Sequence, residues 1–174
     1  EELRKFVRRQ GKSAFLRLHP SVDNAFGVRA KQFLYSEGRS AHFAAALFYL
    51  VDVIRSILLY SWRRYDVVIF VRYLMGTAYL PRPLDKIAYH FFASIVPTSP
   101  FMFFLDVSPP EANRRLQETR EKLEMFENLD ELEQTRRKAI ALALSDKCVI
   151  IDANEQVERV QEAIRKSLMP MLRV

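Results

Sequence analysis

Three uninterrupted apolar runs of strand length divide the chain, at residues 66–71, 101–107 and 148–152. Because polar and apolar residues do not alternate within them, these runs predict strands that are buried on both faces. A shorter run at residues 14–18 predicts a further strand, which ends where His19-Pro20 breaks the pattern. Helices are predicted at residues 2–10, 26–36, 41–61 and 84–94, from 108 to about 145 with a break near Asn128, and at 154–169.

The alternation of strands and helices predicts an α/β fold. Its expected form is a mostly parallel sheet covered by helices on both faces, in three layers. Ligands of such sheets bind at the carboxyl ends of the strands. We therefore expect the functional residues of a single domain, residues 1–174, near residues 18–21, 71–73, 106–108 and 152–153.

The composition narrows the class of protein. The chain has 174 residues, of which 49% are apolar, and this excludes a disordered chain and suits one folded domain. A single cysteine excludes an internal disulfide, and the three histidines lie too far apart in sequence for zinc-ligand spacing. Four glycines are few for a domain with a Gly-rich phosphate loop. Gly11-Lys12-Ser13 is not such a loop, because Phe6 stands where the motif needs glycine.

Arginine supplies most of the positive charge. The chain has 19 Arg and 8 Lys, and its net charge is +6. A guanidinium group pairs with phosphate through two parallel hydrogen bonds. The composition therefore fits small phosphorylated ligands, and nucleic-acid binding through the arginine surface is the less expected alternative.

The most apolar stretch, residues 43–60, is long enough to raise the question of a membrane span. Asp52 and Arg55 lie near its middle, where charge in lipid is costly, so we expect a buried helix of a soluble protein. The first residues show no signal-peptide pattern. The expected protein is cytoplasmic and has no membrane partner.

Arginines at the predicted strand ends are the first candidate functional residues. Arg72 directly follows the strand at 66–71, where it is either an anion-binding group or a helix-start residue paired with a carboxylate. Arg114, Arg115 and Arg120 follow the strand at 101–107 and form either a phosphate-binding lid or a solvated charged face. Tyr79 either hydrogen-bonds a ligand hydroxyl or packs, and His19 is the histidine at a predicted ligand-binding edge.

Five segments, in order, resemble the thymidylate kinase family across nearly the whole chain. They contain a turn like the family's phosphate-contacting turn, a helix with an aromatic ring, an Arg-Tyr segment with a downstream Ala-Tyr, a strand-to-lid passage and a last strand. The matching residues are Leu16-Arg17-Leu18-His19-Pro20-Ser21, residues 46–52 around Phe48, residues 67–73 with Thr77-Ala78-Tyr79, residues 105–112 with Arg115 and Arg120, and residues 124–127 with 149–153.

The resemblance implies transfer of the γ-phosphoryl group of ATP, with Mg²⁺, to a nucleoside monophosphate, dTMP to dTDP first of all, by a homodimer. It implies that Arg72 holds the acceptor phosphate, that Phe48 stacks on the base and that Tyr79 lies against the sugar. A lid at about residues 112–128 would carry Arg114, Arg115 and Arg120. The implied catalytic residues are Arg72, Arg115 and Arg120, and the implied substrate-binding residues are Arg17, Pro20, Ser21, Phe48, Asp52, Arg72 and Tyr79. The metal ligands are not identified.

Three features depart from the family pattern. The P-loop is absent from the sequence, so we expect a strand, a Gly-rich loop and half a helix upstream of Glu1. Val71 replaces the aspartate that precedes Arg-Tyr, which removes a carboxylate from the site. Asp52 stands where the family has a base-reading arginine, so either the base preference differs or Arg55 takes that role. The alternative function is therefore a non-catalytic or altered-specificity nucleotide-binding protein on the same fold.

Overall fold

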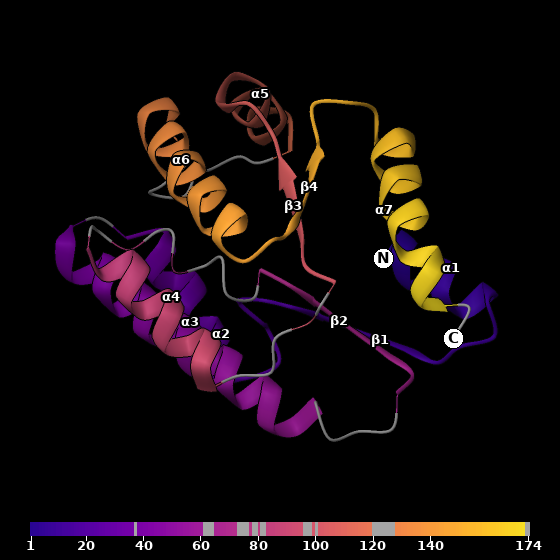
Figure 1. Ribbon diagram of the computed structural model, residues 1–174. Coiled ribbons are helices and arrows are strands. Elements are labelled where there is room, and N and C mark those ends of the chain that lie inside the picture. Colours follow the sequence, from indigo (N-terminus) through magenta and orange to yellow (C-terminus); the bar gives the residue numbers. More distant parts are fainter. Residues whose placement is uncertain are drawn as a thin grey trace.

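Seven helices and four strands make up the described part of the chain (Figure 1). The computed structural model describes residues 1–36, 38–60, 65–72, 77, 80, 83–95, 99, 101–119 and 128–172. The helices are α1 (Glu2–Arg9), α2 (Ala25–Leu34), α3 (Arg39–Tyr60), α4 (Leu84–Ile95), α5 (Pro109–Thr119), α6 (Leu129–Ser145) and α7 (Val157–Leu172). The strands are β1 (Ala14–Leu18), β2 (Val67–Val71), β3 (Phe103–Asp106) and β4 (Val149–Asp152).

Local sequence signals explain where these elements begin. Every predicted strand and helix is confirmed, with ends that shift by a few residues. The predicted break near Asn128 is also confirmed, because Asn128 is the N-cap of α6 and its side chain accepts a 2.9 Å hydrogen bond from Glu131 N. The residues between α5 and Asn128 lie outside the described part of the chain.

The strands pair in parallel, as expected for an α/β fold. β1 pairs with β2 from Ala14–Val67 to Leu18–Val71, and β3 pairs with β4 from Phe103–Val149 to Asp106–Asp152. Among the described residues the two pairs remain separate two-stranded sheets, where the sequence pattern predicts one sheet. Leu105, on β3, is 46% exposed, although parallel strands are usually covered on both faces.

Successive side chains of β3 pack into different parts of the hydrophobic core. Phe104 packs against a cluster from α3, α4 and α6 whose centre is Tyr89, which is fully buried. Phe103 packs against a second cluster, from β4 and α7, that includes Ile151 and Ile164. This division follows from the two-residue period of a strand, which points neighbouring side chains to opposite faces. It places α6 and α7 on different faces of this strand.

Helix α3 covers the end of β1 and packs beside α2 (Figure 1). Its covered side carries polar groups, because Asp52 and Ser56 are fully buried. Its exposed side carries apolar groups, and Phe43 and Leu58 are each 64% exposed. The helix is long and apolar enough over Phe43–Tyr60 to cross a membrane by length and composition alone, and 28% of that window is buried. The expected buried helix is therefore buried along one side.

Candidate active site

The ends of β1 and β2 bring His19 and Arg72 to one edge of their sheet. Leu18 and Val71 are register partners, and the residue after each of them continues past the sheet at its carboxyl end. The backbone of His19 remains tied to β2, because His19 N donates a 3.2 Å hydrogen bond to Val71 O. Both residues therefore lie where parallel sheets bind their ligands.

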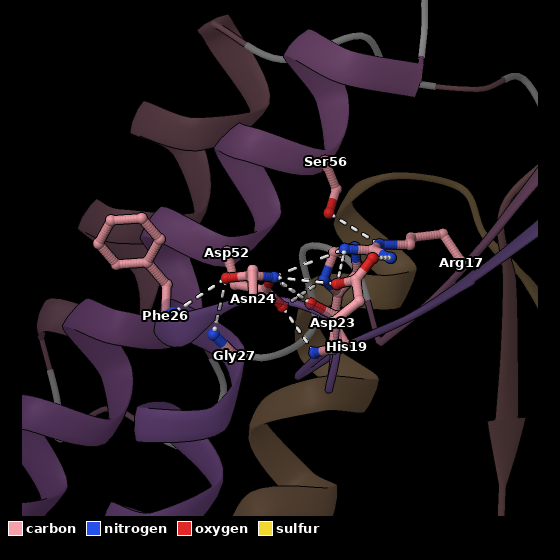
Figure 2. Close-up of polar contacts among 9 residues, drawn as sticks. Arg17, His19, Asp23, Asn24, Phe26, Gly27, Asp52 and Ser56 are labelled. Carbon is pink, nitrogen blue, oxygen red and sulfur yellow. Dashed lines mark hydrogen bonds and ion pairs between the residues drawn. The ribbon is translucent and has the colours of Figure 1, made fainter.

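Asp52 is the centre of a buried hydrogen-bond network beside this edge (Figure 2). Its carboxylate accepts a 2.7 Å bond from Ser21 N and a 2.5 Å bond from Ser21 Oγ. It also accepts a 2.7 Å bond from Asn24 Nδ2 and lies 2.9 Å from His19 Nδ1. These contacts tie α3 to the loop that follows β1, and they occupy both carboxylate oxygens.

Arg17 is held inside the protein by a second set of contacts. Its NH1 and NH2 groups donate to the two carboxylate oxygens of Asp23 at 2.7 and 2.9 Å, and its Nε donates to Ser56 Oγ at 2.9 Å. The guanidinium carbon also lies 4.9 Å from the centre of the Tyr60 ring. Three of these contacts are hydrogen bonds with fixed directions, so the guanidinium orientation is set by the protein itself.

Close packing fixes the start of α2 against the same loop. Asn24 is the N-cap of α2, and its Oδ1 accepts hydrogen bonds from Phe26 N at 2.9 Å and Gly27 N at 3.1 Å. A Cβ atom on Gly27 would overlap the backbone of Ser21, so only glycine allows this approach. Ser21 is thus held between α2 and Asp52 of α3.

His19 presents one free ring nitrogen. The imidazole is stacked near the Phe70 ring, with centroids 6.1 Å apart and an interplanar angle of 15°, and the Tyr49 ring lies at its edge at 6.3 Å. The residue is 3% exposed. Nδ1 faces Asp52, whereas Nε2 is buried and has no hydrogen-bond partner among the described residues. A buried polar atom without a partner is uncommon and calls for an explanation, such as a bound water, ion or ligand.

Hydrogen bonds keep the two carboxylates of this network ionised. Burial by itself would raise the pKa of Asp52, but the hydrogen bonds from His19, Ser21 and Asn24 outweigh burial and hold that pKa well below its ordinary value. The hydrogen bonds from Arg17 likewise hold the pKa of Asp23 well below its ordinary value. At neutral pH both groups are therefore negatively charged.

Arg72 is exposed and has a strained backbone. Its φ is 57°, in the left-handed region, which costs a residue with a Cβ about 1–2 kcal/mol. Strain of this kind at a strand end is common at functional sites. Val71, just before it, provides no carboxylate to the edge.

Phe48 lies between α3 and α2. Its ring is stacked on Phe33, with centroids 5.7 Å apart and an interplanar angle of 7°. The guanidinium carbon of Arg29 lies 5.6 Å from the ring centre. The ring predicted to stack on a base thus contacts α2 in this structure.

The arginines at the end of the other sheet are engaged in ion pairs. Arg114 binds Glu111 and Glu118, and Arg115 binds Glu111 at 2.7 Å through Nε. The hydrogen bonds from Arg114 and Arg115 lower the pKa of Glu111 to about 2. At the end of β3, Arg136 binds both oxygens of Asp106, at 2.7 and 2.8 Å. Charges on α5 and α6 are therefore balanced locally.

The structure brings together some of the predicted site residues and places others apart. Arg17, Pro20, Ser21, Asp52 and Arg72 meet around the ends of β1 and β2, whereas Arg114 and Arg115 belong to α5 near the β3–β4 pair. Tyr79 and Arg120 lie outside the described residues.

Three further residues of the network were not predicted: Asp23, Asn24 and Ser56. Asn24 carries a signal that identifies it, an Asn directly before a helical run. Ser56 carries none, because only the path of α3 over β1 brings it to Arg17.

The described residues do not by themselves make a Mg²⁺ site. They contain no group of three or more His, Cys, Asp or Glu side chains that could hold a metal ion. Asp52, Asp106 and Asp152 each already accept hydrogen bonds from neighbouring side chains. Mg²⁺ usually binds proteins through one or two carboxylates together with substrate phosphates.

Parallel strands joined through helices, with a polar network at their carboxyl ends, define an α/β protein whose candidate site lies at one sheet edge. Residues 1–164 match the family model described as thymidylate kinase. The chain therefore belongs to the thymidylate kinase family, a family of nucleotide-binding transferases that use ATP and share a P-loop α/β fold. No curated protein matches the chain.

Proposed function

We propose that the protein is a nucleoside monophosphate kinase that transfers the γ-phosphoryl group of ATP to dTMP. The observation that carries the proposal is the position of Arg72, which directly follows Val71 at the sheet edge where Val71 O accepts a hydrogen bond from His19 N. An exposed arginine at this edge suits the phosphate of an acceptor nucleotide. Family membership supports the reaction class.

In this proposal the described residues form the acceptor side of the site. Arg72 binds the acceptor phosphate, and Pro20 and Ser21 shape the loop beside it, while Arg17 and Asp52 hold that loop through Asp23 and Ser21. Phosphoryl transfer depends mainly on positioning and charge neutralisation, which such a rigid loop provides.

Further roles complete the proposed site. Phe48 and Tyr79 contact the base and the sugar, and Arg114, Arg115 and Arg120 of a lid at about residues 112–128 neutralise charge on the transferred group. For Arg114 and Arg115 this requires release from Glu111.

The decisive experiment is a coupled assay of ADP release. Full-length polypeptide is incubated with ATP, Mg²⁺ and each of a panel of nucleoside monophosphates, and dTMP is expected to give the highest kcat/KM. Absence of turnover with every acceptor would reject the proposed kinase function.

A non-catalytic nucleotide-binding protein is the second candidate. Val71 favours it, because the strand end lacks a carboxylate, and so does Asp52, whose oxygens are fully engaged by the loop. Calorimetry of dTMP binding, combined with the assay of ADP release, separates the two functions. The non-catalytic candidate binds dTMP but produces no dTDP.

We also propose that the two strand pairs belong to one three-layer, mostly parallel sheet. Two-stranded sheets are marginal by themselves, and the partly exposed Leu105 on β3 and Ile150 on β4 support a further cover over these strands. An experimental structure tests this proposal, and two separate sheets in that structure would reject it.

We propose that the protein is a cytoplasmic homodimer, and the exposed apolar side of α3 supports the dimer. Phe43, Leu47 and Leu58 recur on one side of the helix, while the opposite side is bound to the loop after β1 through Asp52. Light scattering is expected to give twice the monomer mass, and Leu47→Glu with Leu58→Glu to give the monomer. Sedimentation of the protein with liposomes would instead indicate that lipid covers this side.

A further inference from the structure

We infer that Nε2 of His19 is a contact for a phosphoryl oxygen of the bound nucleotide, and that His19 takes up a proton when this contact forms. The inference deepens the proposed function, since it assigns a recognition residue and a proton to the same site. It starts from Nε2 of His19, which is buried and has no partner in the part of the chain that the structure describes.

The hydrogen-bond directions define the state of the ring. Asp52 is ionised and accepts hydrogen bonds only, so His19 Nδ1, 2.9 Å away, carries the proton of that contact. In a neutral ring Nε2 then has a bare lone pair, which repels a phosphoryl oxygen. An ionised phosphoryl oxygen, which only accepts hydrogen bonds, can bind there only when Nε2 is also protonated and donates to it.

The charges around the ring favour the same conclusion. α3 presents Asp52 and the Tyr49 ring, β1 presents Arg17, the following loop presents Asp23, and β2 presents the uncharged Phe70 ring. The charged side chains among these are one arginine and two ionised aspartates. With a neutral His19, these three groups carry one net negative charge. A protonated His19 removes that charge and adds a donor to the one that Arg72 supplies at the same edge.

The position of the ring also fits a ligand. His19 follows β1 at the carboxyl edge of the sheet, and its backbone is bonded to Val71, the residue before Arg72. Nε2 is covered in the unliganded protein, so the nucleotide reaches it when the groups over the strand ends move aside. The contact is then shielded from water, which strengthens a charged hydrogen bond.

Proton uptake is measured by titration calorimetry of dTMP, thymidine and ATP, each in two buffers of different ionisation enthalpy at pH 7. The expected result is uptake of up to one proton with dTMP and none with thymidine, which lacks the phosphate. Uptake with ATP but not dTMP assigns the contact to a phosphate of the phosphoryl donor instead of the acceptor.

The His19→Gln variant keeps a side chain that hydrogen-bonds but cannot take up a proton. It is expected to lose the uptake and to bind dTMP about 10- to 100-fold more weakly, with unchanged affinity for thymidine. His90→Gln, at an exposed position on α4, is the matched control and is expected to behave as wild type. Equal proton uptake in wild type and His19→Gln would overturn the inference.

A second measurement does not depend on the folding of a His19 variant. The chain has three histidines, so ring ¹⁵N NMR spectra of wild type, His42→Gln and His90→Gln identify the His19 signals. Protonation of Nε2 on addition of dTMP supports the inference, and an unchanged neutral ring refutes it. Both tests measure binding alone, so they remain valid if the protein proves not to be a kinase. Kinase activity without proton uptake would reject this inference and leave the proposed function intact.

Discussion

Asp52 binds Ser21 twice, through the backbone N–H at 2.7 Å and the side-chain hydroxyl at 2.5 Å. The two residues are 31 positions apart in sequence, so the pair joins the middle of α3 to the loop after β1. Ser21 belongs to the loop that forms part of the candidate acceptor site, which makes the pair a suitable target for substitution.

Replacing Asp52 with Asn is expected to destabilise the protein. Asn keeps one oxygen as an acceptor, but its NH2 group replaces the second carboxylate oxygen. The buried donors that faced that second oxygen therefore lose their acceptor. Loss of a buried charged acceptor costs about 2–4 kcal/mol. Urea denaturation measures the free energy of unfolding, and Asp66→Asn, at an exposed site near Ser13, serves as a comparison with a smaller expected loss. Equal losses in the two variants would contradict the importance of the network.

The stability of the protein is expected to fall in acid because of the same carboxylate. The pKa of Asp52 is lowered in the folded protein, so its contribution is fully present above the ordinary value of 3.8 and is lost as the pH falls below it. Asp23, with a lowered pKa as well, adds to the effect, although its side chain is partly exposed. Urea denaturation at pH 6 and pH 3 measures the change, and Asp52→Asn is expected to make it smaller. An identical pH dependence in the variant would assign acid unfolding to other groups.

Substitution of Gly27 by Ala tests the close approach of α2 to the loop. The added methyl group overlaps the backbone of Ser21, which has no flexible end to move aside, so we expect a loss of about 1–3 kcal/mol. The melting temperature and the KM for dTMP are expected to change together, because the loop moves. Lys31→Ala, at an exposed position of the same helix, is expected to stay within about 0.5 kcal/mol of wild type. A stable Gly27→Ala protein with normal KM would show that the loop tolerates the shift.

Substitution of Arg72 by Gly separates strain from function. Glycine adopts a φ of 57° without a Cβ clash, so the variant is expected to be about 1 kcal/mol more stable than Arg72→Ala. Both variants are expected to raise the KM for dTMP by at least tenfold, since both lose the guanidinium. Lys147 has a φ of 54°, so Lys147→Gly compared with Lys147→Ala is expected to show the same gain in stability without a change in KM. Normal KM in both Arg72 variants would remove Arg72 from the site.

Much of the fold could be predicted because the signals for its elements are local. The strand at Ala14–Leu18 is observed at the predicted residues, and Asn128 marks the start of α6 as expected. Apolar period, capping side chains and proline all act within a few residues, so the printed sequence contains them. The positions of His19 and Arg72 at strand ends were predictable for the same reason.

The contacts of the site could not be predicted in this way. The sequence marked Asp52 as a departure from the family pattern, but the tertiary structure decided that its partners are His19, Ser21 and Asn24. Arg17 was expected to contact substrate, yet its guanidinium is directed to Asp23 and Ser56 inside the protein. These partners are set by how α3 crosses the end of β1, and that crossing results from packing of the whole core. The sequence by itself determined the elements and their order, whereas only the packed structure determined which polar groups meet, because such contacts join residues tens of positions apart.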